Sequence, residues 1–430
     1  MLNELLLIFI ISTASLIVCM FILRDRLGFV YFISCFLYIT MFLWIPLSWT
    51  ANTLFGLELS SDEIYMPGLW LTLLFFNLYI FLSLFLTRNV RASEIPIYPP
   101  DVNKLVMFIS LFVFIMATLG YVAINGISFS AGNYGDRLAS NAGNGIFMIF
   151  FYLFIPAAFV ILLTYRTKGA LITASGVAIL GGVAVYFILG GSRNVLAAAL
   201  LGTIILAQRL KLISLSTLFS IVIALIFVIN YLAFVRYGQG LDDSTLELGF
   251  RYLIDSLSPY DSFNNIITFY NESDEEFLGL NNIAAQFYGL VPRVLWPEKP
   301  IVPLTNALYY TDVILGSSNE SIIISPTLVG GFYMMAGSIG MLLGLIFLLA
   351  FSYVLEVSIF SSKPFPILIC YTLLPYSFFM MRESLELFIY KVIITLFTFT
   401  FVWSITVVFQ SIKENMYLSG GSTGKVKVSS

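Results

Sequence analysis

The sequence predicts an all-α polytopic membrane protein of about eleven transmembrane helices, on three observations. Hydrophobic residues make up 59% of the 430 residues and charged residues only 10%, a composition typical of membrane proteins. Apolar runs of about twenty residues recur along the chain, and a helix of this length crosses the hydrocarbon core of a bilayer. One stretch, residues 236–325, is too polar to cross a membrane. A soluble enzyme is therefore excluded.

The apolar segments divide the chain into regions. Eight segments precede the polar stretch and three follow it, at about 2–23, 27–47, 67–86, 105–124, 146–165, 170–189, 194–208, 212–235, 326–356, 365–381 and 386–410. We expect transmembrane helices in 1–235 and 326–410, a long loop of short helices in 236–325, and a cytoplasmic tail in 411–430. The tail ends in a Ser/Gly-rich run typical of disorder.

Positive charge predicts how the loops are arranged about the membrane. Short loops rich in Lys and Arg face the cytoplasm. If the helices alternate in direction, most basic residues fall on one side: Arg24, Arg26, Arg88, Arg91, Lys104, Arg166, Lys168, Arg209, Lys211, Lys363, Lys413, Lys425 and Lys427. Most acidic residues fall on the other side, which includes residues 236–325. We therefore expect the long polar stretch outside the cytoplasm.

The long polar stretch is interpreted as a lid over a site at the outer membrane face. Apolar residues recur in it at helical spacing, as in amphipathic helices lying on a membrane: Leu246, Phe250, Leu253 and Leu257, then Ile266, Ile267, Phe269 and Tyr270. Prolines then fix the backbone around Arg293, Trp296 and Lys299. Loops of this length usually carry function, although a plain soluble loop is the alternative.

The residue types present limit the possible chemistry. The chain contains no histidine, so proton transfer must fall to Asp, Glu, Lys or Tyr. Its three cysteines lie in apolar runs and show no disulfide or zinc spacing. The acidic run at 272–276 only loosely resembles a metal-binding site, and the basic and acidic totals nearly cancel, which argues against nucleic acid. We therefore expect no metal and no cofactor.

Arginines at the outer ends of apolar segments are candidates for binding phosphate. Arg193 follows Gly-Gly-Ser and precedes a predicted helix, and a helix N-terminus beside an arginine suits a phosphate. Arg236 and Arg382 each close an apolar segment. The positive-inside rule should remove arginine from this face unless an anion requires it. Snorkelling of each arginine to the lipid headgroups is the alternative.

Carboxylates near the same level are candidates for the general base. Asp255 and Asp261 flank Ser258-Pro259, and Glu383 adjoins Arg382. Each could instead be an ion-pair partner. Ser325 is predicted to cap a helix that begins at Pro326, which would aim a second helix N-terminus at this level.

These motifs occur in the order seen in one family of membrane enzymes. They are Gly190-Gly191-Ser192-Arg193-Asn194, Arg236-Tyr237-Gly238, Asp255-x-x-Ser258-Pro259-x-Asp261, Pro292-x-x-Leu295-Trp296-Pro297-x-Lys299-Pro300, Ser325-Pro326-Thr327-Leu328 and Arg382-Glu383. Over about 190–390 the chain resembles Wzy-type polysaccharide repeat-unit polymerases, which build O-antigen and enterobacterial common antigen, and looks nearest to the common-antigen type.

The resemblance implies a fold similar to that of the GT-C glycosyltransferases, a place in the bacterial inner membrane, and a site that faces the periplasm. It implies that undecaprenyl-diphosphate-linked oligosaccharides are joined by glycosyl transfer, and it leaves room for a chain-length-regulating co-polymerase. We expect the diphosphate to be bound by Arg193, Arg236, Arg382, Lys299, Arg293 and Arg251. Substrate contacts are expected from Tyr237, Trp296 and Ser325, and catalysis from Asp255, Asp261 and Glu383.

Two alternatives stay open. A ligase of the same superfamily would move a finished glycan onto another lipid. A flippase for lipid-linked oligosaccharides would place charged residues deep inside several membrane helices. Glu356, Glu386 and Lys391 keep that second alternative open.

Overall fold

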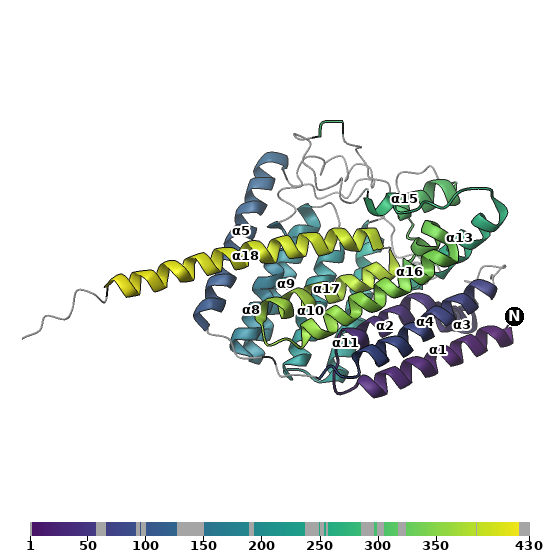
Figure 1. Ribbon diagram of the computed structural model, residues 1–430, viewed down its shortest axis with the longest axis horizontal. Helices are drawn as coiled ribbons and strands as arrows, with labels where there is room; N and C mark the ends of the chain where they lie inside the picture. Colours follow the sequence, from purple (N-terminus) through teal and green to yellow (C-terminus); the bar gives the residue numbers. More distant parts are fainter. Residues whose placement is uncertain are drawn as a thin grey trace, which may run out of the picture.

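The computed structural model describes residues 2–56, 66–91, 95, 100–126, 150–188, 193–236, 249, 253–254, 257–284, 296–298, 305–316, 324–383 and 385–420. Within these ranges the regular structure is helical, and the long helices pack side by side in a bundle (Figure 1). Short helices lie at one end of the bundle. The side chains of Arg193 and Arg236 lie outside the described part of the structure.

Each predicted apolar segment coincides with a helix or a bent helix pair. The elements before the long loop are α1 (Leu2–Leu23), α2 (Phe29–Phe42), α3 (Trp44–Phe55), α4 (Met66–Thr87), α5 (Pro100–Asn125), α8 (Phe154–Tyr165), α9 (Lys168–Ile188), α10 (Arg193–Arg209) and α11 (Leu215–Arg236). The later ones are α13 (Tyr260–Glu272), α15 (Asn306–Tyr309), η1 (Tyr310–Ile314), α16 (Leu328–Ile359), α17 (Pro364–Arg382) and α18 (Leu385–Gly420).

Their length and composition fit a membrane. Among the described residues, seven helices are long and apolar enough to span a bilayer, and α2 with α3, bent by 47° at their junction, makes an eighth if the pair is counted as one span. The helices α8, α10 and α11 are shorter apolar helices. The predicted class, an all-helical polytopic membrane protein, is confirmed.

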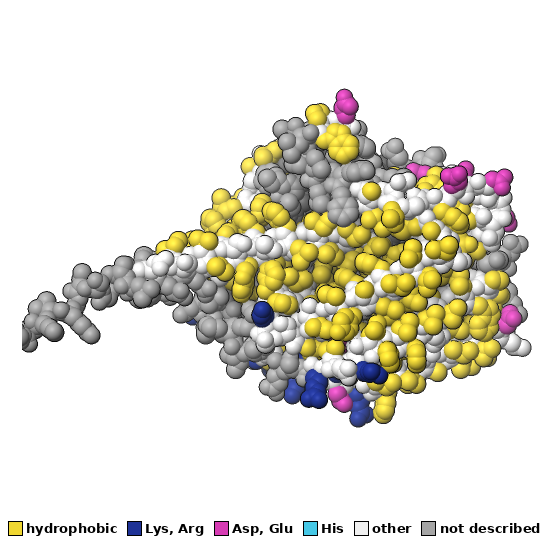
Figure 2. All heavy atoms as spheres, in the orientation of Figure 1, with side chains coloured by type: hydrophobic (Ala, Val, Ile, Leu, Met, Phe, Trp, Pro, Cys, Tyr) yellow, Lys and Arg dark blue, Asp and Glu magenta, His cyan; other side chains and the backbone are white. Residues whose placement is uncertain are grey.

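The surface separates apolar from charged side chains. Hydrophobic side chains cover the middle of the face shown in Figure 2, whereas Lys and Arg gather along its lower edge and Asp and Glu along its upper and right edges. Large hydrophobic residues such as Phe81, Ile172 and Ile339 are exposed, as expected for side chains that face lipid. We call the end of the bundle where α8 and α10 end, and where Arg26, Arg166 and Arg209 lie, the basic end, and the opposite end the acidic end.

Arginines at the basic end bind the backbone. Arg26 donates from Nη1 to the carbonyl oxygens of Thr87 (2.6 Å) and Val90 (2.7 Å), just where α4 ends. Arg209 donates to the carbonyl of Arg26 at 2.9 Å, and Arg166 donates to that of Ile95 at 2.9 Å. The last carbonyls of a helix have no intrahelical donor. These guanidinium groups therefore join helix ends to one another.

Glycines bring α10 close to its neighbours. A Cβ on Gly182 of α9 would lie 2.8 Å from the Cα of Leu196, and one on Gly202 of α10 would lie 2.8 Å from the carbonyl oxygen of Tyr371. Because Pro375 has no N–H to donate to Tyr371, four residues earlier, α17 has a missing intrahelical bond at this point. The close approach holds α10 against α17.

The helix α16 is broken near its start. Ala336 and Gly337 have non-helical backbone angles, with φ of +60° at Gly337. A Cβ on Gly340 would collide with the carbonyl oxygen of Phe332, so residues 328–335 fold back onto the helix that follows. Residues 338–359, about 33 Å long at 1.5 Å per residue, remain to cross the membrane.

The long loop is tied to this break. Leu278 and Gly279 donate their N–H groups to the carbonyls of Met334 (2.9 Å) and Met335 (3.0 Å). The helix α13 buries Phe263, Ile266 and Ile267 and packs on α2, α4 and α16. The amphipathic helix predicted around Ile266 is therefore present, whereas most of the one predicted at 246–257 lies outside the described residues.

Two predictions about helix ends are wrong. The cap of α16 is Thr327 rather than Ser325, because the Thr327 hydroxyl accepts from the N–H of Gly330 at 3.1 Å and its carbonyl accepts from that of Gly331. The helix therefore begins at Leu328. In addition, α18 continues to Gly420, so the first part of the 411–430 tail is helical, since no glycine or proline interrupts it before residue 420.

Candidate functional site

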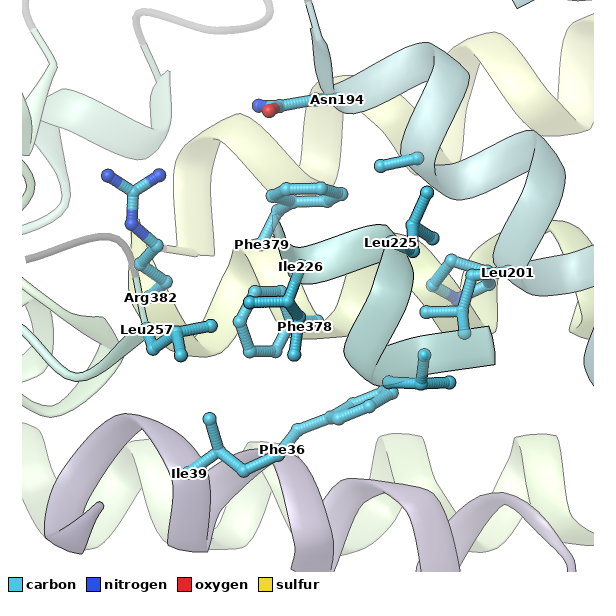
Figure 3. Close-up of a pocket in the computed structure, with 13 residues that line it drawn as sticks. Phe36, Ile39, Asn194, Leu201, Leu225, Ile226, Leu257, Phe378, Phe379 and Arg382 are labelled. Carbon is cyan, nitrogen blue, oxygen red and sulfur yellow. The ribbon is translucent and has the colours of Figure 1, made fainter. Parts of the chain in front are cut away.

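An apolar pocket opens between four membrane helices. One face each of α2, α10, α11 and α17 lines it, together with Leu257 from the long loop: Phe36, Ile39, Asn194, Ala197, Leu201, Val222, Leu225, Ile226, Leu257, Pro375, Phe378, Phe379 and Arg382. The contributions from α17 follow the spacing i, i+3, i+4, i+7 of one helix face. Figure 3 shows the phenylalanine rings of α2 and α17 around the middle of the pocket. Its walls suit a hydrocarbon chain.

The polar groups of the pocket lie together at one end. Of the residues that line it, all are apolar except Asn194 and Arg382. Figure 3 shows Asn194 above Phe379 and the Arg382 guanidinium to the left of Phe379. Asn194 is the second residue of α10, and Arg382 is the last residue of α17. We call this end, formed by Asn194 and Arg382, the mouth. An amide and a guanidinium there can both donate hydrogen bonds to an anion.

Glu383 joins the two groups of the mouth. Its Oε1 accepts a hydrogen bond from Nδ2 of Asn194 at 3.1 Å and lies 3.7 Å from Nη1 of Arg382. The side chains of Arg382 and Glu383 are 24% and 18% exposed, so the pair is partly shielded from solvent. This contact fixes the start of α10 beside the end of α17.

The three arginines of the predicted cluster lie at helix ends. Arg193 is the first residue of α10, next to Asn194, and Arg236 is the last residue of α11. The helices α10 and α11 are consecutive, pack together and are joined by a short connection. The start of α10, with Arg193, therefore lies toward the end of α11, with Arg236. The convergence of the Arg193, Arg236 and Arg382 side chains on one ligand stays a prediction.

Asp261 lies in the first turn of α13, four residues after the pocket residue Leu257. The segment between them is fixed on the membrane helices, since Ser258 donates from Oγ to the carbonyl of Thr40 at 2.9 Å. Tyr260 stacks on Trp44 with ring centroids 5.1 Å apart. Asp261 keeps contact with solvent, yet the surrounding protein displaces enough water to raise the pKa of its carboxyl.

Two of the other predicted site residues are described and lie outside the pocket. Trp296 is exposed, and Ser325 is half-buried before the cap of α16; neither lines the pocket. The remaining predicted site residues lie outside the described residues: Asp255, Tyr237, Arg251, Arg293 and Lys299. Their roles stay predictions.

The charged residues inside the bundle have partners in the protein. Glu356 is buried and accepts from the N–H of Val30 at 3.0 Å, at the start of α2. A Cβ on Gly28 would collide with its carboxylate. Lys391 donates from Nζ to the hydroxyl of Tyr152 at 2.6 Å and lies near two tyrosine rings. Glu356 and Lys391 therefore connect helices, whereas the side chain of Glu386 lies outside the described residues.

Sequence reasoning missed Asn194 and the apolar walls of the pocket. Asn194 stands in the Gly-Gly-Ser-Arg-Asn motif but was assigned no role of its own. The spacing of Phe378, Phe379 and Arg382 on one face of a helix that contains Pro375 was a signal within α17. Nothing in the sequence placed Phe36 and Ile39 of α2 beside residues more than 300 positions later. Among the described residues, no group of three or more His, Cys, Asp or Glu could hold a metal ion.

Comparison with known proteins identifies the family. No solved structure matches the chain, so the similarity to GT-C glycosyltransferases stays a prediction. A family model described as WzyE protein, O-antigen assembly polymerase, matches residues 2–423, which is nearly the whole chain. The first membrane helices, for which the sequence motifs gave no specific signal, are thus part of the match. The chain therefore belongs to the WzyE family of O-antigen assembly polymerases.

Proposed function

We propose that the protein joins undecaprenyl-diphosphate-linked oligosaccharide repeats by glycosyl transfer at the periplasmic face. The observation that carries this proposal is the pocket, which has apolar walls along four membrane helices and an amide and a guanidinium at its mouth. A polyprenyl diphosphate has the same division into a hydrocarbon chain and an anionic group. The mouth and walls therefore suit the two parts of one lipid-linked substrate.

The proposed reaction needs a group that stabilises the leaving diphosphate. The bond between the sugar anomeric carbon and the diphosphate oxygen breaks, and a bond forms between that carbon and an acceptor hydroxyl of the incoming repeat. The hydroxyl proton passes to a base, for which Asp261 is the candidate in the described residues. Negative charge grows on the diphosphate in the transition state, and donors already in place stabilise it most. Arg382 and Asn194 are such donors.

The periplasmic location is supported by the charge pattern. Lys and Arg gather at the basic end of the bundle (Figure 2). Asn194 of the mouth lies at the start of α10, whereas Arg209 of the basic end lies at the end of the same helix. Short basic loops face the cytoplasm. This orientation predicts that a cysteine placed at exposed Asp274 reacts with a membrane-impermeant thiol reagent in intact spheroplasts, and that one at exposed Lys363 reacts only after the membrane is opened. The reverse pattern would contradict the orientation.

The flippase and the ligase each predict a feature that distinguishes it from a polymerase. Glu356 and Lys391 contact neighbouring helices, which supports a structural role for them over a charged translocation path of the kind expected in a flippase. A ligase would require a second lipid as acceptor. The apolar pocket suits either enzyme, and the family match favours the polymerase.

The decisive experiment is polymerisation by the purified protein. The protein is incubated in detergent or nanodiscs with the lipid-linked repeat unit alone, and the product length is read on a gel. A ladder of increasing length is expected. Product that forms only after a separate lipid acceptor is added would identify a ligase, and the absence of any product in both reactions would remove the proposal.

A further inference from the structure

Glu383 contacts the pocket mouth but does not line the pocket. Its neighbours Asn194 and Arg382 line the pocket, but Glu383 does not. Its Oε1 accepts from Asn194 Nδ2 at 3.1 Å and lies 3.7 Å from Arg382 Nη1. One carboxylate thus contacts both polar groups of the mouth, on two different helices.

We infer that Glu383 is a positioning residue that orients Asn194 and Arg382, and that Asn194 is a phosphate-binding residue. This inference rests on the proposed function, because it assigns roles toward the diphosphate of the same substrate. It replaces the expectation from sequence that Glu383 accepts a proton in the reaction.

The hydrogen-bonding capacity of the three groups supports this assignment. An asparagine amide has two N–H donors, and an arginine has five in a fixed planar arrangement. One N–H of Asn194 is used by Glu383, and this bond fixes the plane of the amide and so the direction of the second N–H. Figure 3 shows the Asn194 amide above Phe379 and the Arg382 guanidinium to the left of Phe379. A phosphate at the mouth can therefore accept from both.

Glu383 does not line the pocket, and its carboxylate contacts the two polar groups that do. Its Oε1 already accepts a bond from Asn194. Residues that hold functional side chains in place contribute to catalysis because a small misplacement costs much of the rate. Glu383 has the geometry of such a support.

The test exchanges the two side chains. Asn194→Asp places two carboxylates in contact, which are mutually repulsive. Glu383→Gln keeps an oxygen that can accept from Asn194 but removes the charge beside Arg382. The double variant Asn194→Asp/Glu383→Gln restores one amide, one carboxylate and a hydrogen bond of reversed direction. Polymerisation kcat and KM are measured for all four proteins, with the amount of folded protein checked by gel filtration and thermal unfolding.

The positioning role predicts rescue. Asn194→Asp should lower kcat by about a hundredfold. The double variant should regain about tenfold of that loss, because it removes the repulsion between two carboxylates in contact. The rest of the loss should persist, because an aspartate side chain at this position has no N–H to donate to a phosphate. Glu383→Gln alone should lower kcat by less than about tenfold if Glu383 only positions its neighbours. Loss of a general base would instead lower kcat on the order of a hundredfold or more. If Glu383→Gln lost a hundredfold and the double variant were no better, Glu383 would act on the substrate itself and the inference would be wrong.

The phosphate contact has a separate test that needs no turnover. Binding of undecaprenyl diphosphate without sugar is measured for the wild type, Asn194→Ala and the control Asn77→Ala. Asn77 is half-buried in α4 and accepts from Ser15 and donates to the carbonyl of Leu73. Asn194→Ala should weaken binding by about tenfold, the value of a hydrogen bond to a charged group, and Asn77→Ala should leave it unchanged.

Equal binding by Asn194→Ala and the wild type would remove Asn194 as a phosphate ligand. A wild type that neither binds the lipid diphosphate nor forms polymer would instead overturn the proposed function. Failure of the Asn194 assignment is therefore distinguishable from failure of the proposed function, because in the first case the wild type still binds the lipid diphosphate and in the second it does not.

Discussion

The two ends of the bundle use arginine differently. At the basic end, Arg26, Arg166 and Arg209 donate to backbone carbonyls. At the mouth, Arg382 lies in the wall of a pocket beside Asn194 and the carboxylate of Glu383. The comparison teaches that an arginine's partners, rather than its position at a helix end, separate a structural role from a binding role.

The difference has a physical basis. Backbone carbonyls at helix ends are fixed acceptors that need a donor, so an arginine that binds them stabilises the fold. A guanidinium held by side chains at a pocket can offer N–H groups to a ligand, and arginine matches phosphate bidentately where lysine does not.

The largest effect is expected at the mouth. Arg382→Ala should lower the polymerisation rate by about a hundredfold, the typical cost of removing one preorganised donor to a developing anion. Arg382→Lys should restore only part of the rate, because lysine is a point charge. Arg193→Ala and Arg236→Ala are predicted to behave similarly. The measurement is product length and rate at matched levels of folded protein.

A snorkelling arginine would tolerate lysine fully. If two of the three variants Arg193→Ala, Arg236→Ala and Arg382→Ala made near-normal polymer, the proposal that these arginines bind the diphosphate would be wrong.

A smaller effect is expected from filling the pocket. Ala197 faces the cavity from α10, and Ala197→Trp should raise the KM for the lipid-linked repeat by about tenfold, within the range for overpacking a filled apolar site. Its matched control is Ala14→Trp, on an exposed position of α1, which should leave KM unchanged. If both variants had the KM of the wild type, the pocket would not hold the lipid chain.

At the basic end the effect should be on stability alone. Arg26→Ala removes a charged donor to the carbonyls of Thr87 and Val90, which should lower the free energy of unfolding by about 1.5–3 kcal/mol, the value of a hydrogen bond to a charged group. The rate per folded molecule should not change. Arg24→Ala, at a side chain 63% exposed, serves as the control in the same thermal unfolding assay. A loss of turnover without a loss of stability would contradict the comparison.

The smallest effect is expected on the pH dependence of stability, from replacing Asp261. The pKa of Asp261 is raised in the folded protein by loss of water, so the folded state binds this proton more tightly than the unfolded chain does. The resulting stability is present at pH values below the ordinary pKa of aspartate and is lost as the pH rises through the raised value. Asp261→Asn should remove this dependence, seen as a flatter plot of unfolding temperature against pH. An unchanged plot would show that Asp261 does not titrate with a raised pKa.

The sequence predicted the helices well because hydrophobicity alone decides which segments enter a membrane. It predicted Arg382 and Glu383 as site residues from their place at the end of an apolar segment. It could not predict the hydrogen bond between Asn194 and Glu383, because that contact depends on how α10 packs against α17. The cap at Thr327 was missed for a local reason, since Ser-Pro-Thr offers two hydroxyls and only backbone geometry selects one.

The break in α16 affects how the long loop exchanges amide protons. Leu278 and Gly279 belong to a segment without helical structure, yet their N–H groups are bound to the carbonyls of Met334 and Met335. Exchange with solvent requires these bonds to open. Deuterium uptake at these two amides should therefore be as slow as within the folded-back segment 328–335 and much faster at exposed Asp274 and Glu275, so that a short protected patch marks the point where the loop is attached to the membrane helix.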